Sequence, residues 1–161
     1  MVLVQITKNF RDIDASVHKL EGLIKSICTR FGVSSATVEV AIVDDAQLRK
    51  LNSQFRKCKR STDCLSFDLS EGRKSQSAKS FELIVNGELA VQEARLRGHS
   101  SEAELALYVT HSMLHHLGFD DSTPKQADEM HRTEDEILRE FGYGAVYNNQ
   151  IRRPDSRKTK A

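Results

Sequence analysis

The sequence predicts an α/β fold of the α+β type, a single domain in which a small four-stranded sheet packs against about five helices. Four segments alternate apolar residues with their neighbours at a period of two, as strands do, and five others repeat apolar residues every three or four positions, as helices do. The chain has 161 residues, of which 39% are hydrophobic and 29% charged, a size and composition typical of one soluble domain.

A strand and a long helix open the predicted fold. Apolar residues alternate over residues 2–6, which predicts the first strand. The period changes near Asp12, where an amphipathic helix is expected to begin, and Gly32 suits the position just after its end. The apolar stripe of this helix is Ile13, Val17, Leu20, Ile24, Ile27 and Phe31.

The middle of the chain is predicted to supply three more strands and two short helices. Asp44 and Gln47 form a capping pair for the first short helix, and the second is expected to end at Gly98. Residues 70–80 are small, polar and basic, which predicts a mobile surface loop. The three alternating segments are residues 38–42, 65–69 and 81–85.

A central helix over roughly residues 102–117 is predicted to be buried. Ser101 and Glu104 form a capping box at its start, and apolar residues occupy most of its sides. A helix of this kind belongs in the middle of a protein, so we expect His111 and His115 to lie away from solvent. A last helix is predicted from its cap, Thr123 followed by Pro124, to its end at Gly142.

The charge is distributed unevenly along the chain. Residues 151–161 carry five basic side chains and one acidic one, so the other 150 residues sum to −3 within the total of +1. An acidic body needs a local basic patch to bind nucleic acid. We expect residues 1–147 to form the folded domain and residues 148–161 to be a disordered basic tail.

Several classes of protein are disfavoured. No apolar run is long enough to cross a bilayer, and the first ten residues do not resemble a signal peptide. Three irregularly spaced cysteines do not form a disulfide framework, so a cytoplasmic protein with free thiols is expected. A zinc peptidase of the H-E-x-x-H type is disfavoured because Ser112 occupies the position of its general-base glutamate.

The end of the central helix carries the most distinctive pattern. His111 and His115 are four residues apart, so a helix places both imidazoles on one face, where they can bind one metal ion. Gly118 then turns the chain, and Asp120 or Asp121 can return toward the same point. The pattern indicates a metal site of two histidines and one carboxylate, with a position left for water.

A second region carries four cations just before the third strand. They are either a solvated surface or a phosphate clamp, in which an arginine offers paired donors to phosphate oxygens. Phe55 and Phe119 can stack on a base or belong to the core. The four cations are Arg56, Lys57, Lys59 and Arg60.

These two regions together resemble the YbeY family of bacterial metal-dependent endoribonucleases. The family signature is approximately H-G-x-L-H-L-x-G-[YF]-D-H, and residues 111–121 read H-S-M-L-H-H-L-G-F-D-D. An upstream family element, close to L-N-x-x-[YF]-R-x-x-x-x-T-[DN]-V-L-S-F, is matched by residues 51–67, with Cys64 in place of valine. The similarity covers about residues 1–143.

The resemblance implies a mixed sheet and a nuclease that cleaves single-stranded RNA in rRNA maturation and ribosome quality control. One metal ion, usually zinc, would be held by His111, His115 and the residue at the third ligand position, which is Asp121. The family's catalytic arginine corresponds to Arg56. The implied partners are rRNA, the small ribosomal subunit and its assembly factors, without a membrane.

The sequence departs from the family at the third ligand, where the family has histidine. Aspartate can bind zinc, but its charge makes bound water less acidic and favours Mn²⁺ or Mg²⁺ more than histidine does. Asp120 is the rival ligand to Asp121, and His131 is a weaker substitute. The departure keeps open an alternative function, a catalytically weak factor that binds rRNA during ribosome assembly.

Overall fold

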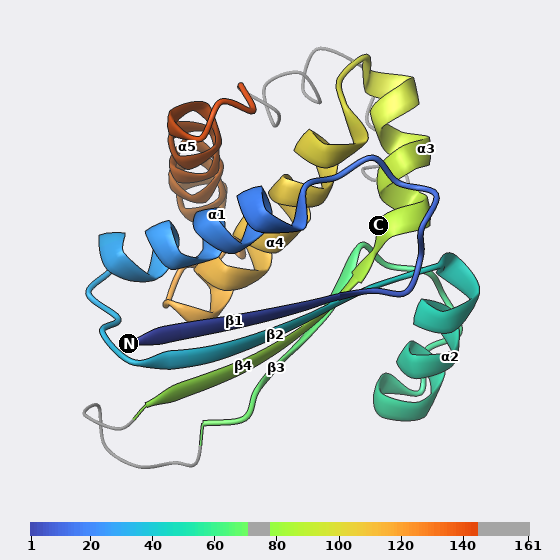
Figure 1. Cartoon of the computed structure of the whole chain (residues 1–161), viewed down its shortest axis with the longest axis horizontal. Coiled ribbons are helices and arrows are strands. Elements are labelled where there is room, and N and C mark those ends of the chain that lie inside the picture. The colour runs from blue at the N-terminus through green and yellow to red at the C-terminus, as the bar shows by residue number, and fades with distance from the viewer. Residues whose placement is uncertain (71–77, 145–161) are drawn as a thin grey trace.

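The centre of the structure is a mixed four-stranded sheet in the order β1-β2-β4-β3 (Figure 1). This is a computed structural model, and it describes residues 1–70 and 78–144. Strands β1, β2 and β4 run parallel, and β3 runs antiparallel to β4 at one edge. The predicted mixed sheet is therefore confirmed. The strands are β1 Val2–Lys8, β2 Ala36–Val43, β3 Cys64–Asp68 and β4 Lys79–Asn86.

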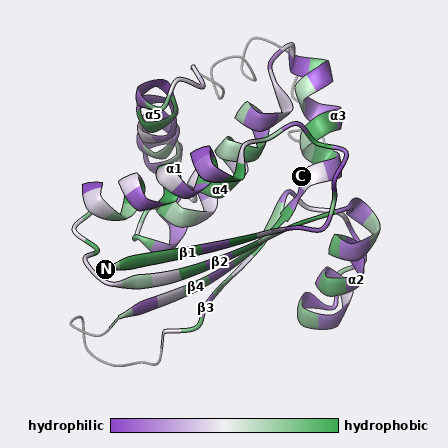
Figure 2. Cartoon of the chain, in the orientation of Figure 1, coloured by the Kyte–Doolittle hydropathy of each residue, from purple (hydrophilic) through white to green (hydrophobic). Residues whose placement is uncertain are grey.

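Five helices in the described residues cover the two faces of the sheet unequally. Figure 1 shows α1, α4 and α5 on one side of the sheet and α2 on the other. Hydrophobic and hydrophilic residues alternate along α2 and α5 in Figure 2, as expected for helices with one buried face. The helices are α1 Val17–Arg30, α2 Asp45–Arg56, α3 Gly87–Arg97, α4 Ser101–His116 and α5 Pro124–Glu140.

Alternation along the strands sends apolar side chains to two separate cores. Val38, Val40 and Ile42 of β2 are at most 2% exposed and belong to the large core beneath α1 and α4. The opposite face supplies a smaller core under α2, made of Val43, Leu48, Leu65 and Ile84. Helix α4 is buried along most of its length, as the sequence predicts, so the large core fixes it firmly above the sheet.

Several predicted helix ends are confirmed by their caps. The side chain of Asp44 accepts a hydrogen bond from the Gln47 backbone N–H at 2.8 Å, and that of Thr123 accepts one from Gln126 at 3.2 Å. Each side chain satisfies a backbone donor that the helix itself cannot. Gly98 follows α3 with a φ of 74°, in the left-handed region that glycine adopts without strain.

One predicted helix start is wrong, and one predicted cap differs by one residue. Helix α1 begins at Val17 rather than Asp12, because the Ser16 hydroxyl accepts from the Lys19 N–H and caps it there. Ile13 packs into the core but lies in the segment before the helix. Its position continues the apolar spacing of α1, so the sequence pattern makes the helix look longer than it is. Helix α4 is capped by Ser100 instead of Ser101, and the buried Glu104 bonds to Arg97 and His99 rather than to the cap.

Two predicted segments fall partly or wholly outside the described residues. Residues 71–77, most of the predicted 70–80 loop, are among them, as are residues 145–161, which include the predicted domain boundary at 147 and the tail. Within the described chain, no helix combines the length and the apolar character that a membrane crossing requires.

Candidate metal centre

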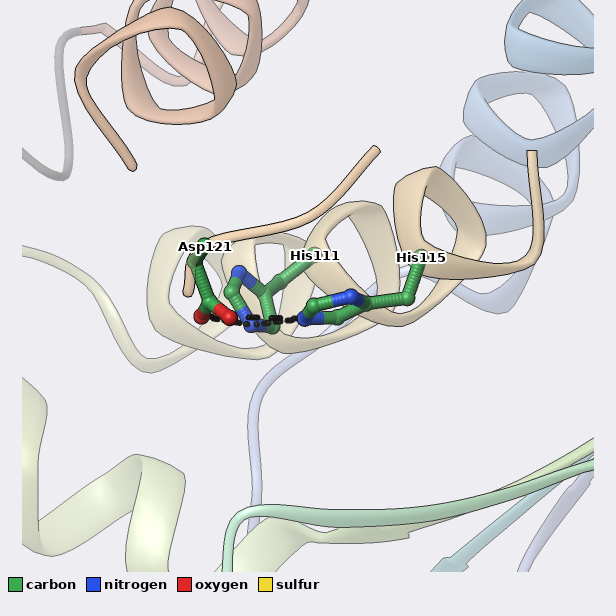
Figure 3. Close-up of side chains that lie close together, drawn as sticks. All are labelled: His111, His115 and Asp121. Atoms are coloured by element: carbon green, nitrogen blue, oxygen red, sulfur yellow. Dashed lines mark hydrogen bonds and ion pairs between the residues drawn. The ribbon is translucent and has the colours of Figure 1, made fainter. Parts of the chain in front are cut away.

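Three side chains meet at the end of α4 and the turn that follows it (Figure 3). The Nε2 atoms of His111 and His115 are 3.1 Å apart. Oδ2 of Asp121 lies 3.8 Å from Nε2 of His111 and 3.7 Å from Nε2 of His115. All three ligand-type atoms lie within 4.8 Å of one another. The fold thus brings together the two histidines and the carboxylate that the sequence pattern predicts as metal ligands.

The site is open to solvent, contrary to the prediction that both histidines are shielded. The side chain of His115 is 36% exposed and that of His111 is 29% exposed. The buried part of α4 ends at Leu114, and the last turn of the helix reaches the surface. The prediction extended the burial of the whole helix to its final turn. An exposed site has the access that a polymeric substrate requires.

The turn after α4 directs Asp121 toward the histidines. Gly118 has a φ of 100°, which favours glycine, and it reverses the chain so that the Phe119 N–H donates to the Leu114 carbonyl at 3.0 Å. The carboxylate of Asp120 accepts from the Asp121 N–H and the Ser122 hydroxyl, each at 2.8 Å. Asp120 is therefore used inside the turn, and Asp121 is the carboxylate that faces the imidazoles.

Each histidine is oriented through its second ring nitrogen. Nδ1 of His111 lies 3.1 Å from a carboxylate oxygen of Glu134, and Nδ1 of His115 lies 3.2 Å from the Phe119 carbonyl. Both oxygens are acceptors, so each Nδ1 can donate its proton there and leave Nε2 available to bind a metal. This is the tautomer that an imidazole uses when it binds a metal through Nε2.

Glu134 is a candidate site residue that was not predicted from the sequence. It is 1% exposed and also contacts Nδ1 of His131 at 2.7 Å, so it bridges two histidines. Burial alone would raise the pKa of Glu134, but hydrogen bonds from His111 and His131 outweigh burial and lower it. For His111, burial lowers the pKa, and the bond and charge of Glu134 raise it above its ordinary value. Glu134 is thus a buried anion beside the candidate ligands.

The arrangement of donors fits one divalent ion. A tetrahedral zinc ion with nitrogen and oxygen ligands at about 2.0–2.1 Å requires neighbouring ligand atoms roughly 3.3–3.4 Å apart. The three separations between His111, His115 and Asp121 are 3.1, 3.7 and 3.8 Å, which bracket that value. Small side-chain adjustments would bring all three atoms into range, and the exposed side of the trio leaves room for water.

The predicted cationic run lies where α2 ends. Arg56 is the last residue of α2, rather than part of a loop, and Lys57 follows it with a φ of 53°, which turns the chain sharply. Arg56, Lys57, Lys59 and Arg60 are all exposed.

Cys64 and Ser112 link the segment that follows this run to the histidine site. The charge of Arg56 acts on the thiol of Cys64, and that thiol hydrogen-bonds to Ser112, the neighbour of His111 in α4. Burial raises the pKa of Cys64 to about 12, so the thiol is neutral and serves as a packing group. Asp63 is also near enough for its charge to raise the pKa of His111. The two motifs identified in the sequence are therefore neighbours in space.

Comparison with known protein families shows the family to which the chain belongs. The family model described as Endoribonuclease YbeY matches residues 5–142. The chain belongs to the YbeY family. The match includes every candidate site residue, from Arg56 to Asp121, and the missed Glu134.

Curated YbeY relatives align over most of the chain. Endoribonuclease YbeY of Wolinella succinogenes is 41% identical over 120 residues, which cover 74% of this chain and 81% of that protein. Endoribonuclease YbeY of Caldicellulosiruptor bescii is 28% identical over 153 residues, covering 88% and 97%. The solution structure of a Thermotoga maritima protein has a TM-score of 0.56 at 23% identity, covering 97% of this chain and 98% of that one, a likeness of fold.

Two further histidines, His116 and His131, do not join the trio of candidate ligands. The ring of His116 stacks on Phe81, with centroids 4.8 Å apart, so this histidine packs against β4. His131 is 6.4 Å from His111 between ring centroids and bonds to Glu134, outside the trio of candidate ligands. Glu134 could have been found from the sequence, because it interrupts the apolar stripe of α5 between Met130 and Leu138.

Proposed function

We propose that this chain is a metal-dependent endoribonuclease that cleaves single-stranded RNA. The observation that carries the proposal is the meeting of His111, His115 and Asp121 within 4.8 Å, where His115 and Asp121 are exposed. Its membership of the YbeY family, whose curated relatives are named endoribonucleases, supports the same reaction.

In this proposal, His111, His115 and Asp121 hold one divalent metal ion. Glu134 and the Phe119 carbonyl keep the two Nε2 atoms aimed at it. When bound, such an ion polarises a phosphoryl oxygen and lowers the pKa of a water molecule. We favour Zn²⁺ because two imidazoles suit it, and Asp121 keeps Mn²⁺ and Mg²⁺ as alternatives.

Arg56 is proposed to bind the scissile phosphate and stabilise the charge that develops on it during cleavage. A guanidinium can donate two parallel hydrogen bonds to phosphate oxygens, and this interaction strengthens as the oxygens gain charge. Lys57, Lys59 and Arg60 would bind neighbouring phosphates. The net charge of −3 over the first 150 residues supports recognition by this local run rather than by overall charge.

The more specific biological role is inferred from the resemblance to the YbeY family. We propose that the substrate is rRNA, that cleavage serves rRNA maturation and ribosome quality control, and that the enzyme meets the small ribosomal subunit and its assembly factors in the cytoplasm. The basic residues of 151–161 could add affinity for RNA.

The test is a cleavage assay on one RNA sequence supplied single-stranded and as a duplex. The protein is stripped with a chelator, shown to be inactive, and reassayed after Zn²⁺, Mn²⁺ or Mg²⁺ is added. We expect cleavage of the single strand to return with at least one ion. Asp121→Ala should lose metal and cleavage together, and Asp121→His should retain both and bind Zn²⁺ more tightly.

The same experiment separates the alternative function. If the wild-type protein and Asp121→His bind the RNA but neither cuts it with any of the three ions, the chain is an RNA-binding assembly factor and the nuclease proposal is wrong.

A further inference from the structure

Phe55 lies on the surface beside the cationic run. It is in the last turn of α2, directly before Arg56, and it is 62% exposed. The sequence left it as either core or a base-stacking residue, and the structure places it outside both apolar cores in the described part of the chain. Single exposed apolar residues are common on proteins, so the surroundings of Phe55 decide whether it has a role.

The ring of Phe55 is supported from one side by Phe67 of β3. The two ring centroids are 5.4 Å apart with an interplanar angle of 62°, an edge-to-face pair. Phe67 is half-buried and packs against the smaller core under α2. The contact fixes Phe55 on a rigid base while most of its surface stays in solvent, as a docking platform requires.

The charges around this platform suit a nucleic acid strand. Arg56 follows Phe55 directly, and the sharp turn at Lys57 keeps Lys59 and Arg60 in the same short connection to β3. Single-stranded RNA alternates phosphates with bases whose faces are free. Proteins that bind it combine cations that follow the backbone with aromatic rings on which bases stack. An aromatic ring beside exposed cations has both halves of that pattern.

We propose that Phe55, backed by Phe67, is a stacking site for one unpaired base of the RNA whose phosphate contacts Arg56. Such a site would favour single strands, because a base within a duplex has no free face. The identity of the occupant rests on the proposed function, but binding at Phe55 can be measured without cleavage.

The first test compares Phe55→Ala with Leu96→Ala in a binding assay. Leu96 of α3 is also 62% exposed and lies outside the cationic run, so its variant is a matched control. Binding of a short single-stranded RNA is measured by fluorescence anisotropy with chelator present, which prevents metal-dependent cleavage. We expect Phe55→Ala to weaken binding by about 5- to 20-fold, in the range for loss of one base–aromatic stack, and Leu96→Ala to have no effect. Equal binding by both variants overturns the proposal.

The second test uses Phe55→Trp as a reporter. The chain contains no tryptophan, so the variant has a single indole placed at the proposed site. We expect it to retain binding and to lose fluorescence when single-stranded RNA is added, with far less quenching by a duplex or by a strand of abasic spacers. Equal quenching by the spacer strand shows that the backbone alone is bound and contradicts stacking.

Two further outcomes are distinguishable. If Phe55→Ala alters the sedimentation of the protein but leaves RNA affinity unchanged, the patch binds a second copy of the chain and the stacking proposal is wrong. If quenching of Phe55→Trp and the loss in Phe55→Ala are both observed while the wild-type protein cuts no RNA, the stacking site stands and the nuclease proposal fails.

Discussion

At the end of α4, the imidazole of His111 is held by Glu134, a carboxylate that is 1% exposed, whereas at the end of α2 the side chain of Arg56 lies in solvent with three other exposed cations. The two helix ends that contribute to the proposed site therefore differ in how they hold their functional groups. At the first, hydrogen bonds to Glu134 and to the Phe119 carbonyl orient the imidazoles. At the second, the chain path is fixed and the side chains extend into solvent.

The connection after α2 has its own anchor, which fixes backbone rather than cations. The buried Asn86 side chain donates to Asp45 at 2.9 Å and to the Thr62 carbonyl at 3.2 Å, and Ser61 also bonds to Asp45. A metal ion would require its ligands in one geometry, which the hydrogen bonds to His111 and His115 would maintain. A flexible RNA strand is better bound by long cationic side chains that extend from a fixed backbone. We therefore expect changes at the metal end to be strongly coupled to one another and changes in the cationic run to act nearly independently.

The largest effect is expected from His115→Ala. Loss of one of three proposed ligands should abolish stable metal binding and reduce cleavage by more than the roughly 10- to 100-fold that loss of a supporting partner costs. Metal content after dialysis and the rate of RNA cleavage measure this. His18→Ala removes an exposed histidine of α1 and should change neither. Full metal occupancy in His115→Ala would contradict the ligand assignment.

Arg56→Ala should reduce the cleavage rate by about 10²- to 10³-fold while metal content stays normal, because it removes one donor to a developing charge. Arg56→Lys keeps the charge but loses the paired donors, so we expect only partial recovery. Arg95→Ala, an exposed arginine of α3, is the control. Loss of metal in Arg56→Ala would mean that the two ends of the site are not separable.

The fold was predictable because its signals are local. Alternation in β2 and the caps at Asp44 and Thr123 depend on residues close in sequence, and each of these elements formed as expected. The errors at the starts of α1 and α4 arose where tertiary contacts mimic a local pattern. Ile13 continues an apolar period from outside the helix, and Glu104 has a buried partner instead of a cap.

The candidate site was predictable in part for the same reason. His111 and His115 are one helical turn apart, so their meeting is a local consequence of α4. Glu134 lies on α5, 23 residues from His111 in sequence, and its contact depends on how α4 and α5 pack. Periodicity places Glu134 on the buried face of α5 but does not show which side chain of α4 it contacts. The exposure of His115 was missed for a related reason, because burial along α4 changes within its last turn.

Glu134→Gln should lower metal affinity by about 10- to 100-fold, the range for loss of an anionic partner to a ligating histidine. Glutamine keeps the size and one acceptor oxygen, so the fold should survive, which a thermal unfolding curve checks. Asp128→Asn removes an exposed carboxylate from the same helix and should leave affinity unchanged. Titration with Zn²⁺ in competition with a chromophoric chelator gives both values. Unchanged affinity in Glu134→Gln would show that packing alone orients His111.

The smallest effect is expected from Lys59→Gln, because an exposed cation with a flexible side chain contributes mainly through counterion release. Each cation that contacts a single strand adds about 0.7 to the slope of log affinity against log salt concentration. Lys59→Gln should therefore flatten that slope by about 0.7 and weaken binding uniformly across RNA sequences. Arg95→Gln removes a positive charge from α3 and should leave the slope unchanged, which excludes a general effect of net charge. Anisotropy titrations from low to moderate salt, with chelator present, measure both slopes. A loss in Lys59→Gln that varies with RNA sequence, or that persists undiminished at high salt, would indicate a fixed contact. The cationic run would then be ordered in the same way as the histidines, and the contrast between the two helix ends would not hold.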